Sequence, residues 1–448
     1  MRRIGTIVTL LSCLALAGPA AAQRSDSGGP TTEEPWDPAA ALRQDRCVAG
    51  ARRVERLPSG LKGRAAAFPI GDAQNELMGV LYTPSYYDPA RTWPVLVEGV
   101  ARNHLAVALK DFTQQAETHG FILLAVEYLY HKGQDAGSFK VWSREGDITV
   151  AHQSRTVPEY LRDMAVDERV LRGLLRRLGR QYAVEKQAVA VTGFLGAGVM
   201  AYRLPMLYPH LFCAGVSRSG GFSQSFVPPP SAKARDRTFY IIFGDKEEPL
   251  TLDNSQQALV YLKSRRFKNV VAERIPNSGV DSRPEIAANY FRATINDRLG
   301  PERAAFDRAA NLAGLLLADR LTDDIRTSSG RPVDGAATAA ALESFITTYP
   351  RSTYRGQARF LLARVLAEEL DDRKRAEDVL RKFSRPPLLS DSTAPEALLY
   401  LAERVLDTQA DAKEVKRILS RLVARTDIAP QQRIRARVLL ARLGTGTE

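Results

Sequence analysis

The segment VAVTGFLGAGVMAY, from Val189 to Tyr202, decides how the chain is organised. Its first residues are apolar and largely β-branched, as in a buried strand, and a glycine-rich turn follows before a helical pattern begins. We therefore predict a strand, a sharp turn and a helix, with Leu195 at the turn. Leucine has neither an oxygen nor a titratable group, so this turn presents no nucleophile for acyl transfer.

Similar short apolar runs alternate with helical patterns between about residues 46 and 299. The predicted strands are Val95–Gly99, Phe121–Val126, Ala188–Thr192, Ala214–Ser217, Thr238–Phe243 and Val270–Ile275, and one helix is predicted at Asp167–Tyr182. Strands that alternate with helices are typical of a doubly wound, mostly parallel sheet. The sequence therefore predicts an α/β domain over residues 46–299. A long loop is predicted from Tyr128 to Asp163.

Several motifs resemble those of one enzyme family and occur in the same order. They are LYTPSYYDP at 81–89, WPVLVEG at 93–99, AETHGFILLA at 116–125, the 189–202 segment and YPHLFCAGV at 208–216. Together they resemble the secreted esterase branch of the α/β-hydrolases, close to polyhydroxyalkanoate-depolymerase-like and feruloyl-esterase-like enzymes. The resemblance implies an α/β-hydrolase-like sheet and a triad in the chain order serine, acid and histidine, with the serine in G-x-S-x-G.

At the triad positions this sequence departs from that pattern. Leu195 stands in place of the serine, and Val280 stands in place of the histidine. Asp245 or Glu247 occupies the position of the acid, but a carboxylate with no histidine to orient has no catalytic role. The five histidines all precede the segment where the triad histidine belongs: His104, His119, His131, His152 and His210. We therefore expect no intact catalytic residue.

The oxyanion-type positions are better preserved than the triad. Glu98 replaces the histidine of the family's His-Gly, but Gly99 remains, and Gly196 follows the nucleophile position. The backbone N–H groups of such residues could still line a pocket, although no nucleophile is present to generate an oxyanion.

The N-terminal residues are typical of an exported protein. Residues 1–22 have two arginines, an apolar stretch and an AAA sequence before Gln23, as a secretory signal peptide does; a lipoprotein signal at Cys13 is the alternative. Residues 23–45 have the composition of a flexible leader. We predict a secreted or periplasmic protein, in which Cys47 and Cys213 either pair or remain buried thiols.

The composition is strongly basic, with a formal net charge of +12. Much of the excess is arginine in the C-terminal helices, where solvated helix faces explain it; a surface for anionic lipid, glycan or nucleic acid is the alternative. No nucleic-acid module, metal-ligand spacing or cofactor motif is recognisable, and no segment of the mature chain resembles a membrane span. We expect no cofactor, metal, nucleic-acid partner or membrane span.

From residue 300 to 448 the pattern is entirely helical and repeats itself. Ala358, Ala397 and Ala436 each precede a Leu-Ala pair, and an amphipathic helix precedes each copy. Small residues at matched positions let helix pairs pack closely, as in a tetratricopeptide-like helical repeat. A plain helical bundle is the alternative. The preceding helices are Leu342–Tyr349, Ala376–Phe383 and Val415–Val423.

Three functional hypotheses follow. The first is a hydrolase-like protein that has lost catalysis and binds a small molecule in the vestigial pocket or a protein partner through the helical repeats. The second is an active carboxylic-ester hydrolase with displaced catalytic residues, for which the candidate nucleophiles are Ser217, Ser219, Ser278 and Ser282. The third is a purely structural envelope protein whose pocket is filled. An open cleft above Leu195 favours ligand binding, whereas packed side chains there favour a scaffold.

Overall fold

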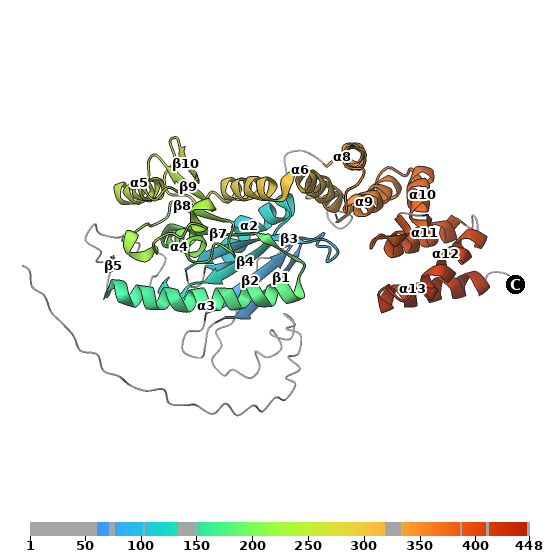
Figure 1. The fold of residues 1–448 in the computed structure, drawn as a ribbon, viewed down its shortest axis with the longest axis horizontal. Helices are drawn as coiled ribbons and strands as arrows, with labels where there is room; N and C mark the ends of the chain where they lie inside the picture. The colour runs from blue at the N-terminus through green and yellow to red at the C-terminus, as the bar shows by residue number, and fades with distance from the viewer. Residues whose placement is uncertain are drawn as a thin grey trace, which may run out of the picture. The chain divides into compact units, whose positions relative to one another are not determined.

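An eight-stranded sheet organises the first part of the protein (Figure 1). The computed structural model describes residues 61–70, 77–101, 104–131, 148–150, 153–318, 333–385, 388–408 and 412–445. The strands of the sheet are β1 (Arg64–Pro69), β2 (Met78–Thr83), β3 (Trp93–Val100), β4 (Ile122–Glu127), β7 (Val184–Phe194), β8 (Ala214–Arg218), β9 (Thr238–Gly244) and β10 (Asn269–Ile275).

The sheet is mixed but mostly parallel, in the order β1-β2-β4-β3-β7-β8-β9-β10. The six neighbouring strands β4, β3, β7, β8, β9 and β10 pair in parallel, whereas β2 pairs antiparallel with both β1 and β4. The predicted fold class, an α/β-hydrolase-like sheet followed by a helical region, is confirmed. All six predicted strands are present, but β1 and β2 were not among the predicted strands.

Helices cover both faces of the sheet. They are α2 (Leu105–His119), α3 (Val157–Gln181), α4 (Gly198–Leu207), α5 (Pro249–Ser264) and α6 (Pro284–Ala318). A hydrophobic core lies on each face of the sheet, and β3 contributes side chains to both, because successive side chains of a strand point to opposite faces. Leu96 packs in the same cluster as Phe112 of α2, whereas Val97 packs in the cluster that contains Met164 of α3.

Helix α3 begins at Val157, well before the predicted start at Asp167. A capping box between Thr156 and Glu159, with a proline in the first turn, starts it there. The predicted loop from Tyr128 is correspondingly interrupted: it contains the 3-10 turn η1 (Leu129–His131), a hairpin of β5 (Ile148–Val150) and β6 (Gln153–Arg155), and the first turns of α3. His152 lies outside the described residues.

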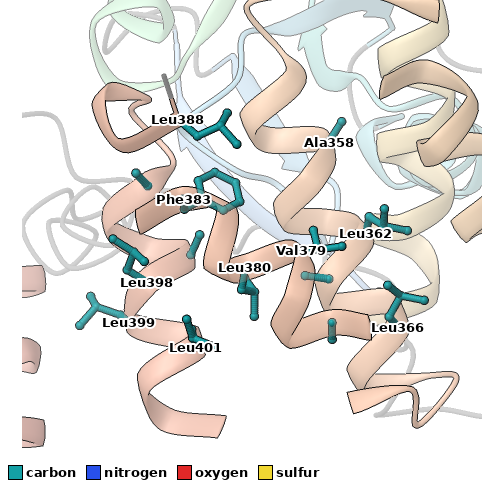
Figure 2. Packing of buried hydrophobic residues seen from close by; sticks show 14 of the residues in the cluster. Ala358, Leu362, Leu366, Val379, Leu380, Phe383, Leu388, Leu398, Leu399 and Leu401 are labelled. Carbon is teal, nitrogen blue, oxygen red and sulfur yellow. The ribbon is translucent and has the colours of Figure 1, made fainter. Parts of the chain in front are cut away.

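Helix α6 changes direction at Gly300, whose φ of 81° and ψ of 169° are not helical. The region beyond this kink is helical throughout its described parts, as predicted. Its helices are α8 (Gly335–Thr348), α9 (Arg355–Glu368), α10 (Arg373–Arg381), α11 (Ala394–Thr408), α12 (Ala412–Ala424) and α13 (Pro430–Thr445). One hydrophobic cluster joins them, and Figure 2 shows part of it, with Leu362 of α9, Leu380 of α10 and Leu398 of α11.

The matched alanines of the predicted repeat lie in this core. Ala358, Ala397 and Ala436 are fully buried. Ala402 is also fully buried, but its counterpart Ala441 is exposed. The helix pairing fits both a tandem repeat and a bundle, so the repeat stays a prediction.

The predicted signal peptide, the leader and Cys47 lie outside the described residues. Cys213 is a free, buried cysteine, and burial raises the pKa of its thiol to about 11. Within the described ranges, no helix combines the length and the apolar character needed to cross a membrane.

Candidate functional site

The turn after β7 carries Leu195 in a conformation that leucine rarely adopts. Its φ is 51°, in the left-handed region, and it begins a short 3-10 turn, η2 (Leu195–Ala197), that leads directly into α4. Such a conformation costs an L-residue roughly 1–3 kcal/mol. A strained strand-to-helix turn with a half-buried leucine is therefore present where the resemblance implies the serine.

Two glycines allow the strand, the turn and the helix to approach one another closely. A Cβ added to Gly193 would lie 2.4 Å from the carbonyl oxygen of Ala197, and one added to Gly198 would lie 2.6 Å from the Cα of Gly220. The second glycine of G-x-S-x-G corresponds to Ala197, which is buried. The glycines at 193 and 198 are therefore explained by backbone packing alone.

Arg218, at the end of β8, forms a buried ion pair next to this turn. Its side chain is completely buried, and one guanidinium nitrogen donates to Oε1 of Glu98 on β3. It also donates to Oγ1 of Thr192 on β7 at 3.1 Å and to the carbonyl of Ser282 at 2.6 Å. The guanidinium lies 4.9 Å from the centre of the Phe112 ring. Arg218 thus links β8, β7 and β3 to the loop between β10 and α6, where the resemblance implies the histidine.

The carboxylate of Glu98 is held in a setting that favours its neutral form. Burial raises its pKa to about 7 and outweighs the opposite effect of Arg218. Among the described residues, neither its Oε2 nor the hydroxyl of nearby Tyr128 has a hydrogen-bond partner. The Tyr128 ring covers Gly99, because a Cβ added there would lie 2.0 Å from a ring atom. Side chains therefore fill the space beside Gly99.

Glu247 forms a second buried network at the position of the triad acid. Its Oε1 accepts hydrogen bonds from Oγ of Ser219 at 2.5 Å, from the backbone N–H of Gly244 at 2.6 Å and from Arg283 at 3.2 Å. Arg283 also donates to Oγ of Ser278 at 2.8 Å. Glu247 contacts no histidine among the described residues, and its charged partner is Arg283.

The other sequence-predicted positions lie apart from these networks. Asp245 is half-buried, and one of its carboxylate oxygens has no hydrogen-bond partner in the described part of the chain. Val280 is 43% exposed in the loop between β10 and α6. The carbonyl of Gly196 accepts a hydrogen bond from the Tyr130 hydroxyl at 2.7 Å, and the oxyanion-type role of its N–H stays a prediction.

The four candidate serines fall into two pairs. Ser217 and Ser219 are buried, and Ser219 has a left-handed φ of 47°. Ser278 and Ser282 are half-buried in the loop before α6, where each contacts an arginine. Among the described residues, no group of three or more histidine, cysteine or carboxylate side chains is placed to hold a metal ion.

Sequence reasoning missed Arg218 and Arg283. The sequence did carry a signal for the ion pair of Arg218 with Glu98, because each of these residues interrupts an apolar run that must be buried in the sheet. Charged side chains are almost never buried without a partner, so two opposite charges in neighbouring strands predict an ion pair. Arg283 lies in a polar loop and carries no such signal.

The helical region carries a second set of charged side chains along α9, α11 and α13. Arg435 pairs with Glu396 at 2.7 Å and with Glu403 at 2.6 Å, and Glu368 pairs with Arg364 at 3.0 Å. The Tyr400 hydroxyl donates to Glu368 at 2.7 Å. A groove of about 860 Å³ runs beside these residues, and the loop of residues 85–91 also lines it.

No protein-family model and no curated protein sequence matches this chain. Among solved structures, it is similar to a ferulic acid esterase from Anaeromyces mucronatus (11% identity, TM-score 0.38), over 55% of this chain and 93% of that one. It is also similar to an uncharacterised protein from Capnocytophaga ochracea (12% identity, TM-score 0.38; 85% and 100% covered). An S-formylglutathione hydrolase from Agrobacterium tumefaciens has 10% identity and a TM-score of 0.36 (54% and 98% covered).

Proposed function

We propose that this protein is a non-catalytic binding protein built on an α/β-hydrolase-like scaffold. The observation that carries the proposal is the pairing of Glu247 with Arg283 instead of a histidine, together with Leu195 at the nucleophile turn. A guanidinium stays protonated in proteins and has no acceptor atom, so it cannot take a proton from a hydroxyl. The acyl-transfer site that the resemblance implies would therefore have neither nucleophile nor base.

The alternative is an ester hydrolase with displaced catalytic residues. Its best candidate nucleophile is Ser219. Ser219 lies in a strained turn and donates a hydrogen bond to Glu247. Against this role, Ser219 is 1% exposed, and its hydroxyl also accepts a hydrogen bond from Arg283. A substrate carbonyl could reach it only if this buried network opened.

Turnover of short acyl esters by the full mature chain tests the proposal. We expect the wild-type protein and a Ser219→Ala variant to hydrolyse the ester at the same rate as a heat-denatured sample. An ester hydrolysis rate above that blank, abolished by Ser219→Ala in a folded variant, would replace the proposal by the displaced-residue alternative.

The binding surface, in this proposal, is the groove beside α9, α11 and α13. Support comes from its size and from its mixture of aromatic side chains, such as Phe360 and Tyr400, with ordered ion pairs, such as Arg435 with Glu396. Protein-binding surfaces are enriched in tyrosine, phenylalanine and arginine. Near Leu195, by contrast, Arg218 and Tyr128 are buried, and the Tyr128 ring lies against Gly99.

A charge reversal in the groove tests this part of the proposal. The full mature chain, an Arg364→Glu variant and an Arg417→Glu control would serve as bait for extracytoplasmic proteins. Arg364 lines the groove, whereas Arg417 is exposed on α12 and is not among the groove residues. We expect a captured partner to be lost with Arg364→Glu alone. Equal capture by all three proteins would place the partner site elsewhere.

A further inference from the structure

Helix α3 presents a row of arginines to solvent that the scaffold does not use. Its buried face contains Tyr160, Met164, Leu171 and Leu178. Arg162, Arg169 and Arg176 lie on the opposite face, because each is separated from the next by seven residues, close to two helical turns. We call these three residues the arginine stripe. Figure 1 shows α3 as one long, unbroken helix beside the sheet.

The stripe has no acidic counterpart on its own helix. Asp167 is buried and accepts a hydrogen bond from the backbone of Leu129 at 2.6 Å, and Glu168 is buried against Arg203 at 2.5 Å. Glu159 is engaged at the helix N-terminus, where it accepts from the backbone of Thr156 at 2.7 Å. Asp163 is half-buried. Every exposed charged residue of α3 is therefore an arginine.

The arginines of the stripe also lack partners elsewhere in the described structure. Among the described residues, Arg162, Arg169 and Arg176 form no ion pair, and Arg172 and Arg177 are exposed beside them. Favourable interaction with the helix dipole applies only near the C-terminus of a helix. It gives no reason for Arg162, which lies in the second turn of α3. Like charges along one helix face repel one another, and a bound anion relieves this repulsion.

We propose that the arginine stripe of α3 binds a linear acidic polysaccharide. Guanidinium groups bind carboxylate and sulfate oxygens in a bidentate manner, and their spacing of about 10.5 Å along the helix presents them to anionic groups that recur along a chain. The uncharged exposed residues of α3 are Pro158, Ala165 and Gly179. They include no large apolar side chain for insertion into lipid and no aromatic ring for stacking on the bases of a single-stranded nucleic acid.

The test compares two triple variants of the full mature chain that lose the same charge. One carries Arg162→Gln, Arg169→Gln and Arg176→Gln. The other carries Arg417→Gln, Arg421→Gln and Arg437→Gln, at exposed positions of α12 and α13. Affinity for a heparin oligosaccharide of defined length would be measured by titration calorimetry over a series of salt concentrations. Circular dichroism would confirm that both variants are folded.

We expect the stripe variant to bind at least about tenfold more weakly and with a smaller dependence on salt, because three charged contacts are removed. The control variant should keep most of the affinity. Equal weakening in both variants would overturn the proposal, because binding would then follow net charge. Tighter binding of duplex DNA or of phosphatidylglycerol vesicles through the same three arginines would also overturn it, because the partner would be of another class.

Discussion

Replacing Arg218 by methionine tests whether the ion pair with Glu98 holds the sheet and the loop before α6 together. The side-chain exposures of the pair are 0% and 4%, and Arg218 makes two further hydrogen bonds. At pH 8 the carboxyl of Glu98, with a pKa of about 7, is mostly ionised. Arg218→Met would leave that charge buried without a partner, which destabilises a protein by about 3–5 kcal/mol.

Urea unfolding at pH 8, followed by circular dichroism, measures this loss. The double variant Glu98→Leu with Arg218→Met should recover most of it, because an apolar pair of similar size can replace a buried ion pair at little cost. Lys268→Met is the control: its ion pair with Asp236 is exposed, so the unfolding midpoint should hardly change. An Arg218→Met variant as stable as the wild type would refute the reasoning, since the pair would then not be buried.

Three further predictions concern the same region. Folding raises the pKa of Glu98 from 4.5 to about 7. Its contribution to the free energy of unfolding is therefore fully present below pH 4.5 and is lost as the pH rises through 7. In urea titrations at a series of pH values, Glu98→Gln should remove about 3 kcal/mol of this pH dependence. Because Leu195 has a positive φ, Leu195→Gly should be more stable than Leu195→Ala by about 1 kcal/mol in urea unfolding, and the reverse order would mean that the turn is not left-handed. Gly99→Ala should cost about 1–3 kcal/mol by contact with Tyr128, whereas Gly173→Ala, in open space on α3, should be neutral or stabilising; thermal melts of both variants provide the comparison.

Local pattern was enough to predict most of the sheet and the turn at Leu195. Apolar runs such as those of β3 and β9 give a strong signal, since strands of a parallel sheet are buried on both faces. Strand β1, with the sequence RAAAFP, is short and rich in alanine, so its pattern is weak. It forms an edge of the sheet through antiparallel pairing with β2, which the sequence pattern does not specify.

The buried networks depended on contacts between residues far apart in the sequence. Glu98 and Arg218 meet because β3 and β8 both flank β7, an arrangement that follows from the strand order and not from either strand alone. The pairing of Glu247 with Arg283 depends on the path of the loop after β10. Composition could predict a basic surface, but the helix was predicted to start at Asp167, so only the start of α3 at Val157 places Arg162 on the same helix face as Arg169 and Arg176.

Labelling with a fluorophosphonate tests the proposed loss of catalysis most directly, because this reagent reacts with an activated serine whatever its natural substrate. The protein would be incubated with the reagent and its intact mass measured, beside an active serine esterase as the positive control. The proposed loss of the triad at Leu195, Glu247 and Val280 predicts an unchanged mass. A stoichiometric adduct that maps to Ser219, and that is lost in Ser219→Ala, would contradict the proposal and establish a working nucleophile.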